Sequence, residues 1–307
     1  MSDPSQPEDP DETEEAGASF EENAPAVAEE EAPTSLTTRT HVRSTDGLFE
    51  FDTSERSDVG CIRKVNEDSV LAAPKSGLWL VADGMGGHAA GDFASQSIVG
   101  QMETLGIPAG ALDLRARFMR RLSTANASIL THSVELGKGA IGSTVAALLI
   151  QQDHYACIWS GDSRVYRYRQ GQLTRVTRDH TEVQQLIDNG TITEDQAFDW
   201  PQRNVITRAI GVTDVPECDM VEGGLADGDI FLLCSDGLTE YYHDSELEGV
   251  LARTPPDALD VLCDQLIETA KERGGKDNVS VIIVRCLENQ LPRFAAQGVF
   301  PEMGGGL

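Results

Sequence analysis

The chain of 307 residues has little positive charge: 24 Lys and Arg stand against 51 Asp and Glu, giving a formal net charge of −27. Its first 38 residues contain 12 Asp and Glu and no Lys or Arg, so the remainder keeps −15 of the −27. A surface this acidic repels polyanions, and we expect neither nucleic acid nor an anionic membrane as a partner. An anionic substrate would need a local source of positive charge.

Long hydrophobic runs and clustered cysteines are also missing. No apolar run approaches the ~18 residues of a membrane-spanning helix, and the N-terminal MSDPSQPEDP lacks the basic and apolar segments of a secretory signal. No Cys-x-x-Cys pair or His-Glu-x-x-His motif is present, which argues against a zinc site. We therefore predict a cytoplasmic protein with reduced thiols in or near its core. The six cysteines are Cys61, Cys157, Cys218, Cys234, Cys263 and Cys286.

The composition divides the chain into a tail, a core and a second tail. Residues 1–48 are rich in Glu, Asp, Pro, Ala, Ser and Thr, and we predict that they are disordered. Residues 49–287 carry the apolar runs of a folded domain, and residues 288–307 read as irregular. Strand and helix patterns are mixed within the domain, which indicates the α+β class. Strands are predicted at 143–150, 154–160, 165–169, 173–176, 230–234 and 279–284, and helices at about 113–136, 244–252 and 256–273.

One stretch, Trp79–Gly91, combines a buried strand, an aspartate and several glycines. Asp83 follows the apolar run, Gly84 comes next, and a helical pattern begins after His88. We predict a glycine turn that lets a ligand approach the backbone. The spacing Gly84-x-Gly86-x-x-Ala89 also fits a dinucleotide-binding fingerprint. However, Asp83 would place a negative charge beside the pyrophosphate, which argues against an oxidoreductase.

Acidic residues recur at the ends of predicted strands, next to turns. One Asp-Gly pair is an ordinary turn, but five such aspartates at the ends of buried strands can converge on one site. Converged carboxylates repel each other unless protons or cations neutralise them. Mg²⁺ and Mn²⁺ prefer carboxylate and carbonyl oxygens, and they would supply the positive charge that a phosphate needs. The five are Asp68, Asp83, Asp162, Asp236 and Asp277.

Six segments, in order, resemble the motifs of the metal-dependent Ser/Thr protein phosphatases, the PPM or type 2C family, in its bacterial branch. They occur across about residues 55–286, which is roughly three quarters of the chain. The resemblance implies a four-layer α-β-β-α sandwich of two antiparallel β-sheets flanked by helices. It also implies that residues 178–204, which are polar with one short helical pattern, form the family's mobile flap. The segments are SDVGCIRKVNEDS, VADGMGGH, AIGST, SGDSRVY, LLCSDGLTE and GGKDNVSVIIV.

The resemblance also implies a centre of two Mn²⁺ or Mg²⁺ ions, with a third, weaker ion in bacterial members. Asp83 would bridge two ions, and Asp68 would bind directly or through water. Asp162 and Asp236 would hold the third ion. The remaining metal ligands implied are the Gly84 carbonyl, Asp236 and Asp277, with Asn278 as a supporting group behind them.

The implied reaction is hydrolysis of phosphoserine and phosphothreonine in proteins by a metal-bridging hydroxide. The metals and Arg63 would stabilise charge on the phosphoryl oxygens, and the planar guanidinium suits two oxygens at once. No cysteine has an Arg six positions on, so the cysteine-phosphatase signature is absent. The expected partners are phosphoproteins, including a Ser/Thr kinase or its substrates, and the chain is expected to act as a monomer that opposes kinase signalling in a bacterium.

One position departs from part of the family. Some members, chiefly eukaryotic, carry a His directly after Asp-Gly that is proposed to protonate the leaving alcohol. Met85 occupies that position here. His88, three residues later, is either an acid or a supporting group, and water is the other proton source. The alternative function is a catalytically inactive phosphatase fold that binds phosphoproteins, although such a protein should lack at least one ligand.

Overall fold

The computed structural model describes residues 38–45, 47–86, 90–137, 140–255 and 257–289. The chain divides into two compact units, residues 1–34 and 35–307, and every described residue belongs to the second unit. Most of the predicted acidic tail and nearly all of the predicted C-terminal tail therefore lie outside the described residues.

Two β-sheets, in which all pairings are antiparallel, form the centre of this unit. The first sheet has the order β1-β2-β12-β11-β8-β9, and the second has the order β10-β7-β6-β4-β3, with β5 paired to the end of β4. The first sheet comprises β1 (Thr38–Thr45), β2 (Phe49–Asp58), β12 (Val279–Glu288), β11 (Ile230–Cys234), β8 (Arg164–Arg169) and β9 (Gln172–Arg175). The second comprises β10 (Asp219–Gly224), β7 (His154–Ser160), β6 (Val145–Gln151), β4 (Leu78–Met85), β3 (Asp68–Ala73) and β5 (Gly142–Ser143).

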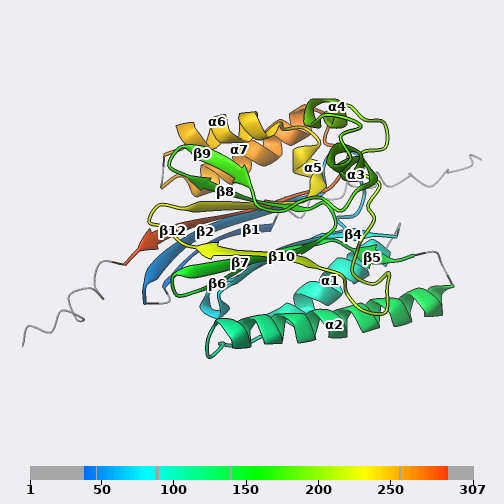
Figure 1. Cartoon of the computed structure of the whole chain (residues 1–307), viewed down its shortest axis with the longest axis horizontal. Helices are drawn as coiled ribbons and strands as arrows, with labels where there is room; N and C mark the ends of the chain where they lie inside the picture. Colours follow the sequence, from blue (N-terminus) through cyan, green and yellow to red (C-terminus); the bar gives the residue numbers. More distant parts are fainter. Residues whose placement is uncertain (1–37, 46, 87–89, 138–139, 256, 290–307) are drawn as a thin grey trace, which may run out of the picture. The chain divides into compact units, whose positions relative to one another are not determined.

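Helices cover the outer face of each sheet, which gives four layers (Figure 1). The second sheet is covered by α1 (Ala90–Glu103) and α2 (Ala111–Leu136). The first is covered by α6 (Asp244–Arg253) and α7 (Leu259–Glu272), with the short α5 (Asp236–Thr239) after β11. The predicted four-layer α-β-β-α sandwich of the α+β class is confirmed. A short 3₁₀ helix (Pro74–Ser76) joins β3 to β4.

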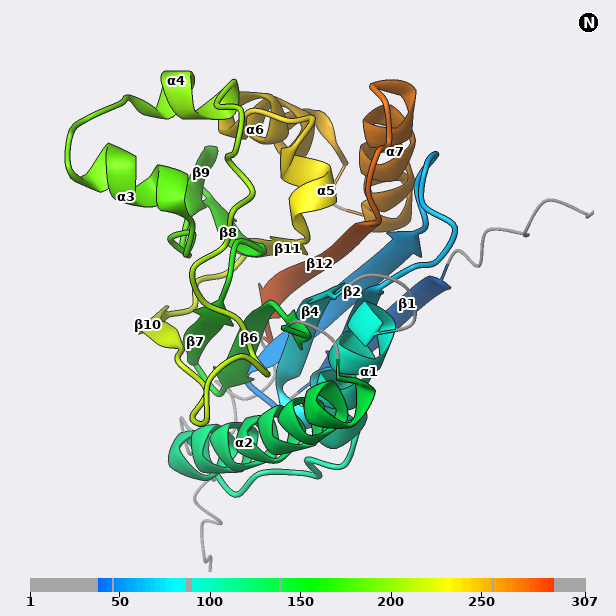
Figure 2. The same cartoon turned by 90° about the vertical axis from the view of Figure 1, so that its right-hand side faces the viewer.

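Two small helices stand apart from the layers, at the end of the sandwich where β4 and β5 end (Figures 1 and 2). They are α3 (Glu182–Asp188) and α4 (Glu194–Phe198), and they pack on each other through their own small apolar cluster. The segment that carries them is closed at its base, where Thr181 bridges to Ile206. We call residues 178–207 the flap segment.

The continuous apolar runs of the sequence follow from burial on both faces of the strands. In β4, Leu80 faces the core beneath α1 and α2, whereas Trp79 and Val81 face the core between the two sheets. In β12, Ile283 faces the core beneath α5–α7, and its neighbour Ile282 faces the core between the sheets. A strand buried on both faces has no polar side to alternate with its apolar side.

The fold begins earlier than predicted. We expected the domain to start at Phe49, but β1 pairs with β2 from Thr38 to Thr45, so the boundary at residue 48 is wrong. The strand is polar and forms the edge of its sheet, where pairing rests on backbone hydrogen bonds more than on burial. β2 itself continues through Asp58, and β12 ends at Glu288, one residue beyond the predicted domain.

Further elements were missed or misplaced. The strand β10 and the helices α4 and α5 were not predicted, since all are short and largely polar. The predicted glycine turn starts later than Gly84, which lies within β4 and pairs with Ser143; the positive φ occurs at Gly86, and residues 87–89 lie outside the described residues. Helix α2 matches the prediction, and it ends in a left-handed cap at Gly137.

Candidate active site

The register of one strand pair brings the first two predicted aspartates together. Asp68 begins β3 and is the Cα partner of Asp83 in β4. Asp68 is buried, and its Oδ2 accepts a hydrogen bond from the Ser235 hydroxyl (2.8 Å). Its Oδ1 is buried as well, and within the described part of the chain it has no hydrogen-bond partner. A buried carboxylate oxygen without a donor is costly unless a proton or a cation meets it.

The backbone around Asp83 is fixed by β6 and by α1. The Asp83 N–H donates to the Thr144 hydroxyl (3.0 Å), and the Thr144 N–H donates to the Asp83 carbonyl (2.8 Å). Gly84 donates its N–H to the Glu67 carbonyl (3.1 Å). A Cβ at Gly84 would stand 2.0 Å from the Gly91 carbonyl oxygen, so only glycine fits between β4 and the start of α1. This close approach, rather than a turn, explains Gly84.

The remaining aspartates arrive from the first sheet and its connections. Asp236 begins α5 directly after β11, Asp162 lies between β7 and β8, and Asp277 precedes β12. Burial raises the pKa of Asp236 to about 6, with the charge of Asp277 adding to the rise and a hydrogen bond with Asp83 opposing it. Burial also holds the pKa of Asp162 well above its ordinary value, and the charge of Asp236 adds to this rise.

The two paired aspartates are perturbed in the same sense. Burial raises the pKa of Asp68 to about 7; hydrogen bonds oppose the rise, and the charges of Asp236 and Asp277 add to it. Burial holds the pKa of Asp83 well above its ordinary range, followed by the charges of all four other aspartates. The structure therefore brings the five predicted aspartates into one repelling group with Asp83 at its centre.

Arg63 is a cation in direct contact with this group. Its Nη2 donates to Asp277 Oδ2 (2.7 Å), and its Nη1 lies 3.6 Å from Glu67 Oε2. The Arg63 side chain is 46% exposed, so part of its guanidinium is open to a ligand. Partial burial lowers the pKa of Arg63, but Asp277, Glu67 and Asp83 together outweigh it and raise that pKa above its ordinary value.

Asn278 holds the loop that carries Arg63. Its Nδ2 donates to the carbonyls of Val59 and Val65 (3.0 Å each), and its Oδ1 accepts from the Glu67 N–H (2.8 Å). One side chain thus fastens both ends of the loop. The supporting role of Asn278 behind the metal ligands stays a prediction.

Glu67 is a site residue that the sequence reasoning missed. It is 8% exposed, and its Oε1 is buried without a hydrogen-bond partner among the described residues. A Cβ at Gly91 would meet this oxygen at 2.6 Å, so a second glycine makes room for the carboxylate. The available signal was its place beside Asp68 in the Asn66-Glu67-Asp68 run, but Glu67 is not itself at a strand end.

Within the described residues, no three His, Cys, Asp or Glu side chains stand close enough to form a finished metal site. The group nevertheless fits divalent cations. Asp68 Oδ1 lacks a donor, and burial together with the charges of the neighbouring aspartates raises the pKa of Asp83 well above its ordinary value. Carboxylates this close need protons or cations, and hard cations prefer such oxygen ligands.

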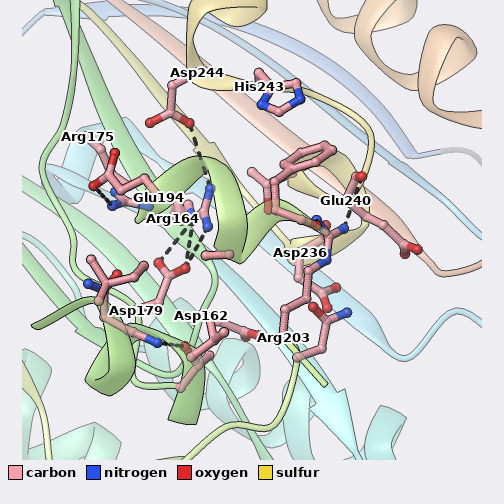
Figure 3. A pocket seen from close by; sticks show the side chains of 18 of the residues that line it. Asp162, Arg164, Arg175, Asp179, Glu194, Arg203, Asp236, Glu240, His243 and Asp244 are labelled. Carbon is pink, nitrogen blue, oxygen red and sulfur yellow. Dashed lines mark hydrogen bonds and ion pairs between the residues drawn. The ribbon is translucent and has the colours of Figure 1, made fainter. Parts of the chain in front are cut away.

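A cavity of about 220 Å³ opens from this group toward the flap segment (Figure 3). Asp162 and Asp236 form its inner wall, while α3 and α4 face α5 and α6 across it. The arginines that line the cavity already have partners: Arg164 pairs with Asp179 (2.7 Å), Arg175 with Glu194 (3.3 Å), and Arg203 donates to the Glu240 carbonyl (3.0 Å). The cavity is therefore acidic close to the aspartates.

The residues proposed for proton donation are only partly described. His88 lies outside the described residues, so its predicted role stays a prediction. Met85 ends β4, and its Cε would lie 2.9 Å from a Cβ placed at Gly142, so it packs toward β5. A thioether carries no acidic proton.

All six cysteines are free thiols: four are buried, Cys218 is half-buried, and Cys61 is exposed, which corrects its predicted place in or near the core. None of the helices in the described ranges is both long and apolar enough to cross a bilayer.

Comparison with known proteins assigns the chain to a family. The family model described as Protein phosphatase 2C matches residues 63–280. The Ser/Thr protein phosphatase PstP of Mycobacterium tuberculosis is 38% identical over 230 residues, which are 74% of this chain and 43% of PstP. The Ser/Thr phosphatase Stp of Listeria innocua is 32% identical over 239 residues, covering 75% of this chain and 93% of Stp.

A solved structure agrees with this assignment. The crystal structure of the PstP catalytic domain in complex with two manganese ions superposes with a TM-score of 0.70 at 35% identity, covering 78% of this chain and 100% of that one. The present chain thus spans less than half the length of full PstP, although it spans the whole of that catalytic domain. The chain belongs to the bacterial protein phosphatase 2C (PPM) family.

Proposed function

We propose that this chain is a metal-dependent protein phosphatase that hydrolyses phosphoserine and phosphothreonine in proteins. The observation that carries the proposal is the position of Asp83, which lies at the centre of five mutually repelling carboxylates with the partly exposed Arg63 beside them. Membership of a phosphatase family, with relatives named Ser/Thr phosphatase, supports it.

The metal ligands are proposed as Asp68, Asp83, the Gly84 carbonyl, Asp236 and Asp277, with a third ion between Asp162 and Asp236. Two manganese ions in the PstP catalytic domain support this choice of cofactor, and Mg²⁺ suits the same oxygens. When bound, such ions lower the pKa of coordinated water and stabilise charge on phosphoryl oxygens. Glu67 has a buried oxygen without a partner among the described residues, and we propose that this oxygen is an additional hydrogen-bond acceptor behind the metal ions.

Arg63 is proposed to bind the substrate phosphate. Its guanidinium is held from one side by Asp277, which fixes its direction and leaves its exposed N–H groups for phosphate oxygens. Asn278 keeps the loop in place, so Arg63 is already oriented before substrate arrives. Pre-oriented donors cost little reorganisation during the reaction. Met85 cannot supply a proton to the leaving alcohol, and we propose water for that step.

Membership of the family also supports proposals about the substrates, the oligomeric state and the location of the chain in the cell. The proposed substrates are phosphorylated proteins, including a Ser/Thr kinase or that kinase's own targets, and the chain is proposed to act as a cytoplasmic monomer. The acidic cavity beneath the flap segment favours protein substrates over nucleic acid, since polyanions are repelled there.

The test is release of inorganic phosphate from a phosphothreonine peptide by the purified chain. With Mn²⁺ present we expect turnover, and with excess EDTA we expect none. Manganese binding measured by calorimetry on the same sample separates two kinds of failure. A protein that binds Mn²⁺ and folds but releases no phosphate would instead be an inactive module that binds phosphoproteins.

A further inference from the structure

His180 lies next to the group of aspartates without belonging to it, and it has no part in the proposed reaction. It lies in the flap segment and is 8% exposed. Its ring stacks against Trp159 at the end of β7, with centroids 6.1 Å apart and planes 20° apart. Trp159 in turn donates its indole N–H to the Arg178 carbonyl (2.8 Å). The ring is therefore held in one plane between β7 and the flap segment.

The ring and the main chain of His180 both form hydrogen bonds with Gly161, the residue before Asp162. The Gly161 N–H donates to His180 Nδ1 (3.2 Å), and the His180 N–H donates to the Gly161 carbonyl (2.9 Å). Gly161 has a φ of +104°, and a Cβ there would meet Thr144 Cγ2 at 2.6 Å. Thr144 also binds the backbone of Asp83, so the backbones that carry Asp83 and Asp162 are packed against one side chain.

Asp219 sets the orientation of the His180 ring. Because Nδ1 accepts the Gly161 N–H, the neutral ring carries its proton on Nε2, which lies 3.3 Å from Asp219 Oδ2. Arg208 Nη1 donates to the other oxygen of Asp219 (2.9 Å). This chain of contacts is the arrangement by which a carboxylate fixes the tautomer and direction of a histidine.

The same histidine fastens the base of the flap segment. Its carbonyl accepts from the Thr207 N–H (2.7 Å), next to the bridge between Thr181 and Ile206 and the bond from the Glu182 N–H to the Val205 carbonyl (3.0 Å). The base of the flap segment and the backbone of Asp162 are therefore joined through one residue.

We propose that His180, oriented by Asp219, is a positioning residue that fixes the Gly161–Asp162 backbone to the base of the flap segment and so places the Asp162 carboxylate. This inference rests on the proposed function, which supplies the reaction that the Asp162 site would serve. Loss of the Gly161 contact should weaken cation binding between Asp162 and Asp236 and loosen the base of the flap segment together, because the ring that accepts from Gly161 belongs to the residue whose carbonyl accepts from Thr207.

The experiment compares variants of His180 and Asp219 that keep or lose different parts of the Gly161–His180–Asp219 contacts. His180→Asn keeps an acceptor near the position of Nδ1, whereas His180→Gln reaches the position of Nε2 and loses the acceptor for Gly161. Asp219→Asn keeps the ring but removes the charge that orients it. His154→Asn is the matched control, since His154 also binds an aspartate (Asp153, 2.7 Å) but is exposed and remote from the aspartate group.

Two readouts are measured on the full chain: Mn²⁺ titration by calorimetry, and hydrogen exchange of peptides covering residues 180–182 and 205–207. In His180→Gln we expect the weaker class of Mn²⁺ sites to lose about 10-fold in affinity, as for other residues that orient metal ligands, and the flap peptides to exchange faster. His180→Asn should keep the affinity within about 3-fold, and Asp219→Asn should fall between the two.

His180→Gln that behaves like His154→Asn in both readouts would overturn the proposal. If circular dichroism shows that His180→Gln does not fold, Asp219→Asn is the test instead. An unchanged affinity of the weaker class of Mn²⁺ sites in that variant then overturns the proposal. The proposed function fails separately: wild-type protein that shows the metal and exchange effects but hydrolyses no phosphopeptide refutes the activity and leaves the positioning role standing.

Discussion

Asp68 and Asp83 are direct cross-strand partners in the β3–β4 pair. Like charges placed opposite each other in an antiparallel pair destabilise a sheet, and here both carboxylates are also buried or partly buried. The arrangement is tolerable only with protons or cations between the two strands. The strand register thus links the fold directly to the proposed metal chemistry.

Removing one central carboxylate should abolish most activity without unfolding the protein. We expect Asp83→Asn and Asp236→Asn each to lower kcat by about 100-fold or more at saturating Mn²⁺, because a ligand is lost with little change in volume. The melting temperature of the metal-free variants should equal or exceed that of wild type, since repulsion is relieved. The measurement is phosphate release from a phosphothreonine peptide.

The exposed Asp257→Asn serves as the control for this pair and should leave kcat unchanged. Full turnover in either Asp83→Asn or Asp236→Asn at saturating Mn²⁺ would show that the aspartate group does not hold the reactive metals.

The metal-free protein should lose stability as pH rises. Burial and neighbouring charges raise the pKa of Asp68 to about 7 and that of Asp236 to about 6, from an ordinary 3.8. Between about pH 4 and about pH 7 the folded state therefore holds protons that the unfolded chain has released, so the free energy of unfolding falls through this window. Chemical denaturation in EDTA at several pH values measures this slope.

Mn²⁺ replaces those protons, so its stabilising effect should be larger at pH 8 than at pH 5. Asp68→Asn should flatten the slope of the metal-free protein, and the difference from wild type isolates this site from other titrating groups. An equal Mn²⁺ effect at both pH values, with equal slopes in both proteins, contradicts the prediction.

The sequence was enough to find the five aspartates because each lies in or beside a strand that carries an apolar run, as Asp236 does after Ile230–Cys234. Such runs occur where strands are buried on both faces, as Trp79 and Leu80 are on opposite faces of β4. Strand ends in packed antiparallel sheets then meet at one end of the sandwich. The motifs gave the family as well, and the matching structures agree with it.

Other features have no local signal. β1 is a polar edge strand, so its pairing depends on the partner strand β2 and leaves no hydrophobic pattern to read. Glu67 gains its importance from burial beside Gly91, which is distant in sequence. The role of Gly84 was misread for the same reason, because the group that excludes a side chain there belongs to α1.

The guanidinium geometry of Arg63 should matter more than its charge. We expect Arg63→Ala to raise KM for the phosphopeptide and to lower kcat/KM by about 10- to 100-fold, which corresponds to the loss of charged hydrogen bonds to phosphate. Arg63→Lys should recover only part of this loss, because an ammonium cannot contact two oxygens in a plane. Steady-state kinetics with the peptide measures both.

The neighbouring Lys64→Ala tests whether any positive charge on the exposed loop suffices. An equal loss in Lys64→Ala and Arg63→Ala would assign the effect to general electrostatics. Mn²⁺ binding by calorimetry should be preserved in all three variants, since Arg63 is not proposed as a metal ligand.

Gly84→Ala should destabilise the fold as well as the site. The added Cβ would stand 2.0 Å from the Gly91 carbonyl oxygen and 2.7 Å from that of Glu67, so either α1 or the Glu67 backbone must move. Overpacking of this kind costs about 1–3 kcal/mol in the free energy of unfolding.

Gly100→Ala is the matched control, because Gly100 lies within α1 and a Cβ there meets nothing within 4 Å. That change should stabilise the protein by about 0.5–1 kcal/mol, since alanine loses less backbone entropy in a helix. Urea unfolding in EDTA measures both without interference from metal binding, and a Gly84→Ala protein as stable as wild type would show that β4 and α1 are not packed as described.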